Sequence, residues 1–126
     1  MTPRQLEELD LLRTRFPDLE VVDDGAWVRL PRYGVPGDGW TRLDSPVVFQ
    51  IPATVAQEPY AFYVPKDLVL KDGTTIQNFT DGETPFPGSW GKFSWNITWQ
   101  PAADIRGGTT VLDFAMSFAR RLAQGA

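Results

Sequence analysis

The pattern of apolar and polar positions predicts a helix near the start of the chain, at residues 3–16. Its apolar positions recur at spacings of three and four, while charged residues occupy the opposite face. The apolar positions are Leu6, Leu9, Leu12 and Phe16, and the charged ones are Glu7, Glu8, Arg13 and Arg15. Thr2 and Gln5 have the spacing of a capping box, and Pro3 suits the first helical position. Phe16-Pro17 predicts the helix end, because a residue before proline avoids the helical region.

A second helix is predicted from Thr109 or Thr110 to about Leu122, with Asp113 three positions after Thr110 as a further capping signal. The arginines Arg120 and Arg121 suit its C-terminal end. Its expected buried stripe is Leu112, Ala115, Met116, Ala119 and Leu122, flanked by Phe114 and Phe118.

Between the helices, short apolar runs bounded by turn residues predict strands. The runs are 19–22, 26–30, 46–52 and 59–65. Asp23-Asp24-Gly25 separates the first two, which form either a hairpin or a single strand after a loop. The Gly- and Pro-rich segment 31–40 is expected to be a loop, with Trp40 packing back on the body. Residues 71–89 are expected to be irregular.

This order of elements predicts an α+β fold made of one domain, residues 1–126. The expected architecture is an N-terminal helix, an antiparallel meander of three to four strands, a long irregular crossing and a C-terminal helix.

The crossing holds a dense aromatic stretch, residues 85–101, with three of the five tryptophans of the chain. Rings this dense bury large areas, so the stretch is expected to lie on or in the core. It also holds the polar candidates for a site, Lys92, Ser94 and Asn96.

Composition excludes several kinds of chemistry. The chain has no cysteine and no histidine, so disulfides, thiolate or imidazole ligands and Ser-His-Asp or Cys-His catalysis are impossible within it. No cofactor or metal is expected. The net charge of −4, with no basic stripe, argues against nucleic-acid binding. No apolar run reaches the length of a membrane helix and no signal peptide is recognisable, so we expect no membrane partner and a cytoplasmic protein.

Each polar candidate has a functional and a structural interpretation. Ser94 and Asn96 are two residues apart and would share a face of a strand, as an oxygen nucleophile and an oxyanion donor, or else they satisfy backbone groups. The structural interpretation is favoured, because no base is available to activate Ser94. Lys92 would direct a carboxylate or approach an acyl group, or it is simply solvated, which is the commoner case.

Two larger sets of residues also have structural explanations. The tryptophans Trp90, Trp95 and Trp99 would stack on a sugar or base, or they anchor the core. Four carboxylates lack the spacing of a metal-binding loop, and they are Asp72, Asp81, Glu83 and Asp104.

Several segments resemble a bacterial family related to ubiquitin-conjugating enzymes, the prokaryotic E2 family E. Residues 90–96 (WGKFSWN) resemble its Trp-x-x-Trp-Ser-x-His signature, and 99–104 (WQPAAD) its Trp-x-Pro-x-x-Asp. The opening helix followed by 16–21, the proline-ended run 46–52 and the aromatic run 59–64 resemble other parts of that family. The resemblance covers about residues 5–122, and its specificity lies in 90–104.

The resemblance implies a UBC/RWD-like fold and a function with ubiquitin-like proteins. The catalytic cysteine of an ordinary E2 is absent, and Asn96 stands where the family signature has histidine. The expectation is a pseudo-E2 in a bacterial ubiquitin-like modification or phage-defence operon, binding a ubiquitin-like or E1-like protein through Trp90, Lys92, Phe93, Trp95 and Asn96. The alternatives are a transferase with Ser94 as nucleophile and an aromatic-lined domain that binds a small ligand.

Overall fold

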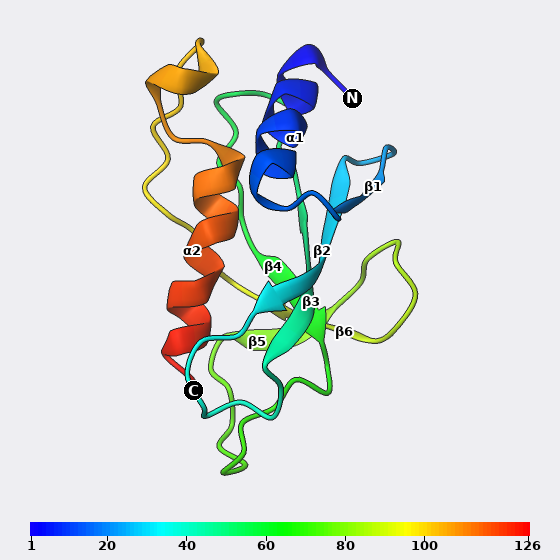
Figure 1. Ribbon diagram of the computed structural model, residues 1–126, viewed down its shortest axis with the longest axis vertical. Helices are drawn as coiled ribbons and strands as arrows, with labels where there is room; N and C mark the ends of the chain where they lie inside the picture. Colours follow the sequence, from blue (N-terminus) through cyan, green and yellow to red (C-terminus); the bar gives the residue numbers. More distant parts are fainter.

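The computed structural model describes residues 1–126 and contains two α-helices and a six-stranded antiparallel sheet (Figure 1). The helices are α1 (Pro3–Arg15) and α2 (Val111–Ala123), and a 3-10 turn, η1 (Ile105–Gly107), precedes α2. The strands are β1 (Glu20–Val22), β2 (Trp27–Gly34), β3 (Asp44–Gln50), β4 (Phe62–Pro65), β5 (Phe79–Gly82) and β6 (Trp90–Phe93). Their order in the sheet is β1-β2-β3-β4-β6-β5. The predicted α+β class is therefore confirmed, with more strands than the three or four expected.

The first helix begins and ends where the sequence predicts. The Thr2 hydroxyl accepts a hydrogen bond from the backbone N–H of Gln5 at 3.1 Å, and the Gln5 side chain accepts one from the Thr2 N–H at 2.8 Å. Leu9 and Leu12 are buried, but Leu6 is half exposed, so the expected apolar stripe was wrong at that position. Glu8, expected on the solvent face, is buried instead.

Glu8 is buried because it joins the two helices. Its carboxylate accepts a 2.7 Å hydrogen bond from the backbone N–H of Val111, the first residue of α2, and pairs with Arg4 at 3.1 Å. A carboxylate is favourable at a helix N-terminus, where backbone N–H groups lack partners inside the helix. Arg4 also donates to the carbonyls of Ala102 and Ala103 in the crossing. One ion pair therefore connects α1, the crossing and α2.

The second helix is also capped as predicted, and Ala115 and Leu122 are buried as expected, but the rest of its buried stripe differs. Thr110 and Asp113 form a reciprocal capping box. Met116 is exposed and Leu112 is only half-buried, whereas Phe114 and Phe118 are fully buried. Both rings contact Phe49 of β3 edge-on, so the helix turns its aromatic side to the sheet. These phenylalanines, treated as flanking residues in the prediction, make the central contact.

The strands β1 to β4 form a meander in chain order. β1 and β2 form a hairpin, the first of the two arrangements expected at Asp23-Asp24-Gly25, with Gly25 and Ala26 both at positive φ. The expected loop at 31–40 was wrong in its first part, because β2 runs on to Gly34 past an irregularity between Leu30 and Tyr33. Pro31 cannot donate a ladder hydrogen bond, which accounts for the break in register.

The strands β5 and β6 lie in a part of the chain that was expected to be irregular. They form an antiparallel hairpin, and β6 also pairs with β4, so the sheet continues beyond the meander. Gly91 of β6 makes this packing possible. A Cβ atom there would collide with the ring of Phe79, which lies over the glycine. The sequence pattern missed β5 because its four residues, FTDG, have little apolar character.

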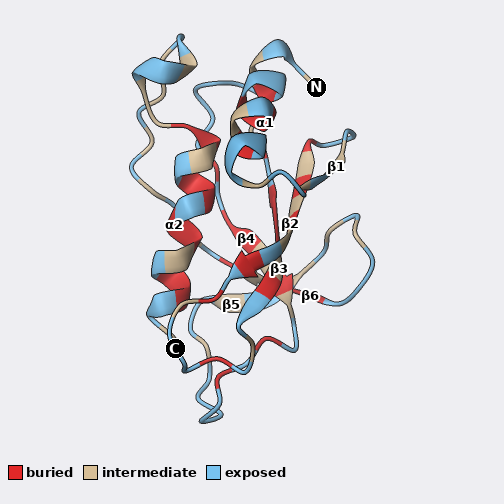
Figure 2. Ribbon diagram, in the orientation of Figure 1, coloured by how far each residue is buried: buried red, intermediate tan, exposed pale blue.

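The helices cover one face of the sheet, and the core lies between the helices and that face (Figure 2). Phe62 stacks on Phe93 at 4.9 Å and on Phe118 of α2 at 4.2 Å between ring centroids. Two polar aromatic side chains fix α2 to the sheet, one from β2 and one from the segment between β2 and β3. Tyr33 donates to the carbonyl of Ala115 at 2.6 Å, and Trp40, packed back as expected, donates to that of Leu122 at 2.7 Å. Burial raises the pKa of Tyr33 to about 12.

Candidate functional site

The three polar candidates, Lys92, Ser94 and Asn96, lie on one side of the chain at the end of β6 and just after it. Lys92 is in β6, opposite Tyr63 of β4. The chain stays paired beyond the strand end, because the Ser94 N–H donates to the carbonyl of Asn78 and the Trp95 carbonyl accepts from Ala61. An extended chain alternates its side chains, which places Lys92, Ser94 and Asn96 on one side. The sequence-based expectation that Ser94 and Asn96 share a face agrees with this pairing.

Each of these three residues contacts the neighbouring segment 58–60. The Nζ atom of Lys92 lies 5.3 Å from the centroid of the Tyr60 ring. The Tyr60 hydroxyl forms a 3.1 Å hydrogen bond with Oγ of Ser94. Nδ2 of Asn96 donates to the Glu58 carboxylate at 3.2 Å. We call these five residues, Glu58, Tyr60, Lys92, Ser94 and Asn96, the crossing strip. All are exposed except Lys92, which is half-buried.

The geometry does not activate Ser94 as a nucleophile. Its only side-chain partner is the Tyr60 hydroxyl, a phenol that is a weak base in its protonated form. Glu58, the carboxylate of the strip, is hydrogen-bonded to Asn96 instead. Asn96 retains a second amide hydrogen, because a primary amide carries two donors. The strip therefore offers hydrogen-bonding groups and an ammonium at the surface, without a base paired to the serine.

The other side of the same segment belongs to the core. Phe93 is fully buried, between Phe62, Phe79 and the guanidinium of Arg121, which lies 4.6 Å from its ring centroid. Trp90 is only 4% exposed. Phe93 and Trp90, two of the residues expected to contact a partner, therefore have their rings buried in the fold. Of the five residues expected to bind a partner, Lys92, Trp95 and Asn96 reach the surface.

The three tryptophans of the stretch anchor three different places. The indole N–H of Trp90 donates to the carbonyl of Phe86, that of Trp95 to the hydroxyl of Ser117 in α2, and that of Trp99 to the carbonyl of Val55. They do not line one common cavity. An aromatic platform built from all three is therefore not present.

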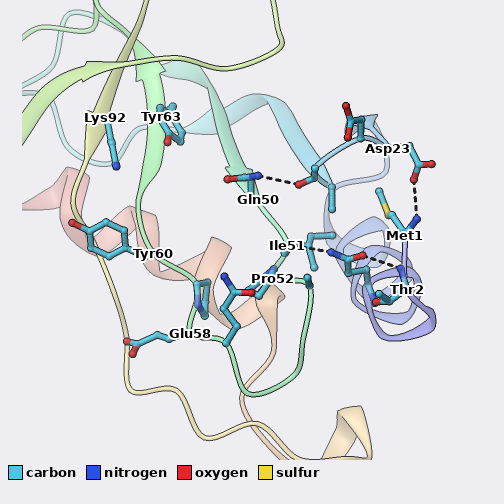
Figure 3. Close-up of a pocket in the computed structure, with 17 residues that line it drawn as sticks. Met1, Thr2, Asp23, Gln50, Ile51, Pro52, Glu58, Tyr60, Tyr63 and Lys92 are labelled. Atoms are coloured by element: carbon cyan, nitrogen blue, oxygen red, sulfur yellow. Dashed lines mark hydrogen bonds and ion pairs between the residues drawn. The ribbon is translucent and has the colours of Figure 1, made fainter.

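The largest hollow of the molecule lies beside the crossing strip (Figure 3). It has a volume of about 940 Å³ and is bordered by the start of α1, the β1–β2 turn, the end of β3, and residues 57–60. Lys92, Tyr60 and Tyr63 lie at one end, and Asp23 lies at the other, with Gln50 between them. Sequence reasoning missed this cavity, because its residues come from segments that only the folded chain brings together. The one signal was the aromatic run at 59–64.

Burial raises the pKa of the Tyr63 phenol above its ordinary value of 10.0. Its hydroxyl makes no hydrogen bond to the protein, and neither does the ammonium of Lys92. The Tyr63 ring packs against Trp27 with 5.5 Å between centroids. One end of the cavity thus presents two unpaired donors on adjacent strands.

The acidic candidates lie apart from one another, and no group of three or more Asp or Glu residues is placed to hold a metal ion. The Thr74 side chain, and the Thr74 backbone N–H that donates to Asp72, lower the pKa of the Asp72 carboxyl group. Asp81 pairs with Lys66 at 3.0 Å. Asp104 caps η1, as expected of a turn before the last helix. Neither helix is long and apolar enough to cross a membrane.

Comparison of the chain with known protein families, with curated proteins and with solved structures gives no match.

Proposed function

We propose that this chain is a UBC/RWD-like domain that works as a pseudo-E2: it binds a ubiquitin-like or E1-like protein without carrying it as a thioester. We further propose that it acts in the cytoplasm, in a bacterial ubiquitin-like modification or phage-defence operon. The proposal starts from the resemblance of residues 90–104 to the E2-like family signature. The α+β class and the order of elements, with α1, a four-strand meander, a crossing and α2, support it.

The observation that carries the proposal is the crossing strip. In this segment the apolar signature residues Trp90 and Phe93 are buried, while Lys92, Ser94 and Asn96 remain at the surface. The strip combines an ammonium, a hydroxyl, an amide and a carboxylate without a nucleophile–base pair. Groups of this kind form the polar contacts of a protein interface, which carries about one hydrogen bond per 100–200 Å².

Binding is favoured over catalysis by the chemistry that the chain lacks. It has no cysteine to form a thioester and no histidine to serve as a base. An amide at Asn96 is able to donate to an oxyanion, but one of its hydrogens is already used by Glu58. The β5–β6 hairpin also extends the sheet up to Phe93. Pairing in this hairpin makes the residues that follow, Ser94 to Asn96, more rigid than an isolated loop.

The test is a binding measurement with the E1-like and ubiquitin-like proteins encoded beside this gene. Asn96→Arg places a long charged side chain in the strip and is expected to weaken binding about tenfold or more. Asp38→Arg introduces the same side chain at an exposed position of the loop 35–40 and is the matched control. Equal affinities of the two variants, or no binding of either partner at micromolar concentration, would overturn the proposal.

The same reagents test the transferase alternative. With ATP, the E1-like enzyme and the ubiquitin-like protein, an oxyester on Ser94 would appear as an adduct that hydroxylamine cleaves and that Ser94→Ala abolishes. We expect no such adduct from the unmodified protein, and therefore no difference between it and Ser94→Ala in this assay.

A further inference from the structure

The cavity beside the crossing strip has two chemically different ends. At one end, Lys92 and Tyr63 are cross-strand partners on β6 and β4, and neither polar tip has a hydrogen-bond partner in the protein. At the other end is Asp23 of the β1–β2 turn (Figure 3), and Asp24 of the same turn also lines the cavity. A cavity of about 940 Å³ is at the upper end of the range for ligand pockets.

The donor end is suited to a single negative charge. It offers an ammonium and a phenol, the ammonium lying 5.3 Å from the centroid of the Tyr60 ring. A carboxylate accepts from both groups at once. A phosphate dianion is usually held by several arginines, and this cavity has none among its residues. A carboxylate therefore fits better than a phosphate.

The other end is suited to a positive charge. Asp23 accepts a hydrogen bond from the amino group of Met1 at 3.3 Å, whereas the Asp24 carboxylate has no partner in the protein. Glu58 lies on the Tyr60 side of the cavity, where it accepts a hydrogen bond from Asn96, so the negative charge of this end comes from the turn alone. Charged side chains at opposite ends give a neutral sugar no advantage, but they complement a ligand that carries both signs.

We infer that this cavity binds a short peptide that ends in a free carboxylate and has a basic side chain a few residues earlier. The carboxylate lies against Lys92 and Tyr63, and the basic side chain lies against Asp24. Several peptide residues span the distance between the ends, past Gln50, whose side-chain nitrogen is already bonded to the carbonyl of Gly25 at 3.0 Å. This inference rests on the cavity alone and does not use the resemblance to E2-like proteins.

The test is a fluorescence anisotropy titration of the full chain with fluorescein-labelled hexapeptides. The first probe is Ala-Arg-Ala-Arg-Ala-Ala with a free C-terminal carboxylate, and the second is the same peptide with a C-terminal amide. A third replaces both arginines by glutamate, and a fourth ends in phosphoserine amide. We expect the first probe to bind at least about tenfold more tightly than each of the others, because each lacks one charge-assisted contact.

Two variants locate the contacts. Lys92→Met keeps the aliphatic stem, and we expect it to weaken the carboxylate peptide about tenfold while leaving the amide peptide unchanged. Lys71→Met, at an exposed lysine in a turn outside the cavity, is the control and should bind like the unmodified protein. Asp24→Asn should weaken the arginine peptide, with Asp38→Asn as its control.

Equal binding of the carboxylate and amide peptides would overturn the inference, as would no binding of the first probe at about 1 mM. Tighter binding of the phosphoserine peptide would show a phosphate site instead. The comparison of free acid and amide needs no variant, so it holds even if Lys92→Met fails to fold. Failure here leaves the binding test with Asn96→Arg unaffected, since that test measures whole protein partners.

Discussion

The two sides of the segment 90–97 differ in what holds them in place. On one side, Phe93 sits among Phe62, Phe79 and Arg121 and has no exposed surface. On the other, Ser94 and Asn96 are exposed and are held by hydrogen bonds to Tyr60 and Glu58. A single stretch therefore contains residues that the fold buries and residues that remain at the surface.

Phe93→Ala is the substitution expected to destabilise the buried side most. Removing a fully buried ring leaves a cavity, and we expect the free energy of unfolding to fall by about 3–5 kcal/mol. Urea denaturation followed by tryptophan fluorescence measures the change. A loss below about 1 kcal/mol, typical of a surface substitution, would contradict the burial of this side chain.

Gly91→Ala tests the same side through one added carbon atom. The new Cβ would collide with the Phe79 ring, which must move away from β6. Overpacking of this kind costs typically about 1–3 kcal/mol, and we expect a value near 2 kcal/mol from thermal or urea unfolding. Gly73→Ala is not a suitable control, because that glycine has positive φ; Gly34→Ala is suitable, since nothing lies within 4 Å of its Cβ position.

The hydrogen bond of Tyr33 to α2 makes the stability of the protein depend on pH in alkaline solution. Burial raises the pKa of Tyr33 to about 12 in the folded protein from an ordinary value of 10.0. The unfolded state therefore loses its proton first as the pH rises. The contribution of neutral Tyr33 is complete below pH 10 and is lost as the pH rises through 12. We expect the free energy of unfolding to fall by about 1 kcal/mol more, between pH 9 and pH 11, in the native protein than in Tyr33→Phe. Equal slopes would show that Tyr33 ionises alike in both states.

The smallest effect on stability is expected on the exposed side. Ser94→Ala and Asn96→Ala each remove one surface hydrogen bond, and each should change the free energy of unfolding by less than about 0.5 kcal/mol. Differential scanning calorimetry would detect a larger change. Losses comparable to that of Phe93→Ala would place these residues among the structural ones and would remove the distinction between the two sides.

The local elements could be predicted where neighbouring residues act on one another. The capping residues at Thr2 and Thr110, the helix end at Phe16-Pro17 and the hairpin at Asp23–Gly25 all lie where the sequence places them. Each depends on groups a few residues apart. The burial of Glu8 could not be predicted in this way, because its partner, the Val111 N–H, is 103 positions away.

Only part of the crossing strip could be predicted from the sequence. The alternation of polar residues at 92, 94 and 96 shows that they share a side, but nothing local shows that Glu58 and Tyr60 lie against them. The strand β6 was missed because aromatic density alone does not distinguish an irregular core segment from a strand. Its identity as a strand depends on pairing with β4 and β5.

By itself the sequence determined the α+β class, the presence and approximate limits of both helices, and the absence of cysteine and histidine chemistry. These follow from short-range geometry and from which side chains exist. Only the tertiary structure decided which aromatic residues are available for contact and where the cavity lies. Burial depends on the register of strands distant in sequence, and this register turned Phe93 inward and brought Lys92, Tyr63 and Tyr60 together at one end of the cavity.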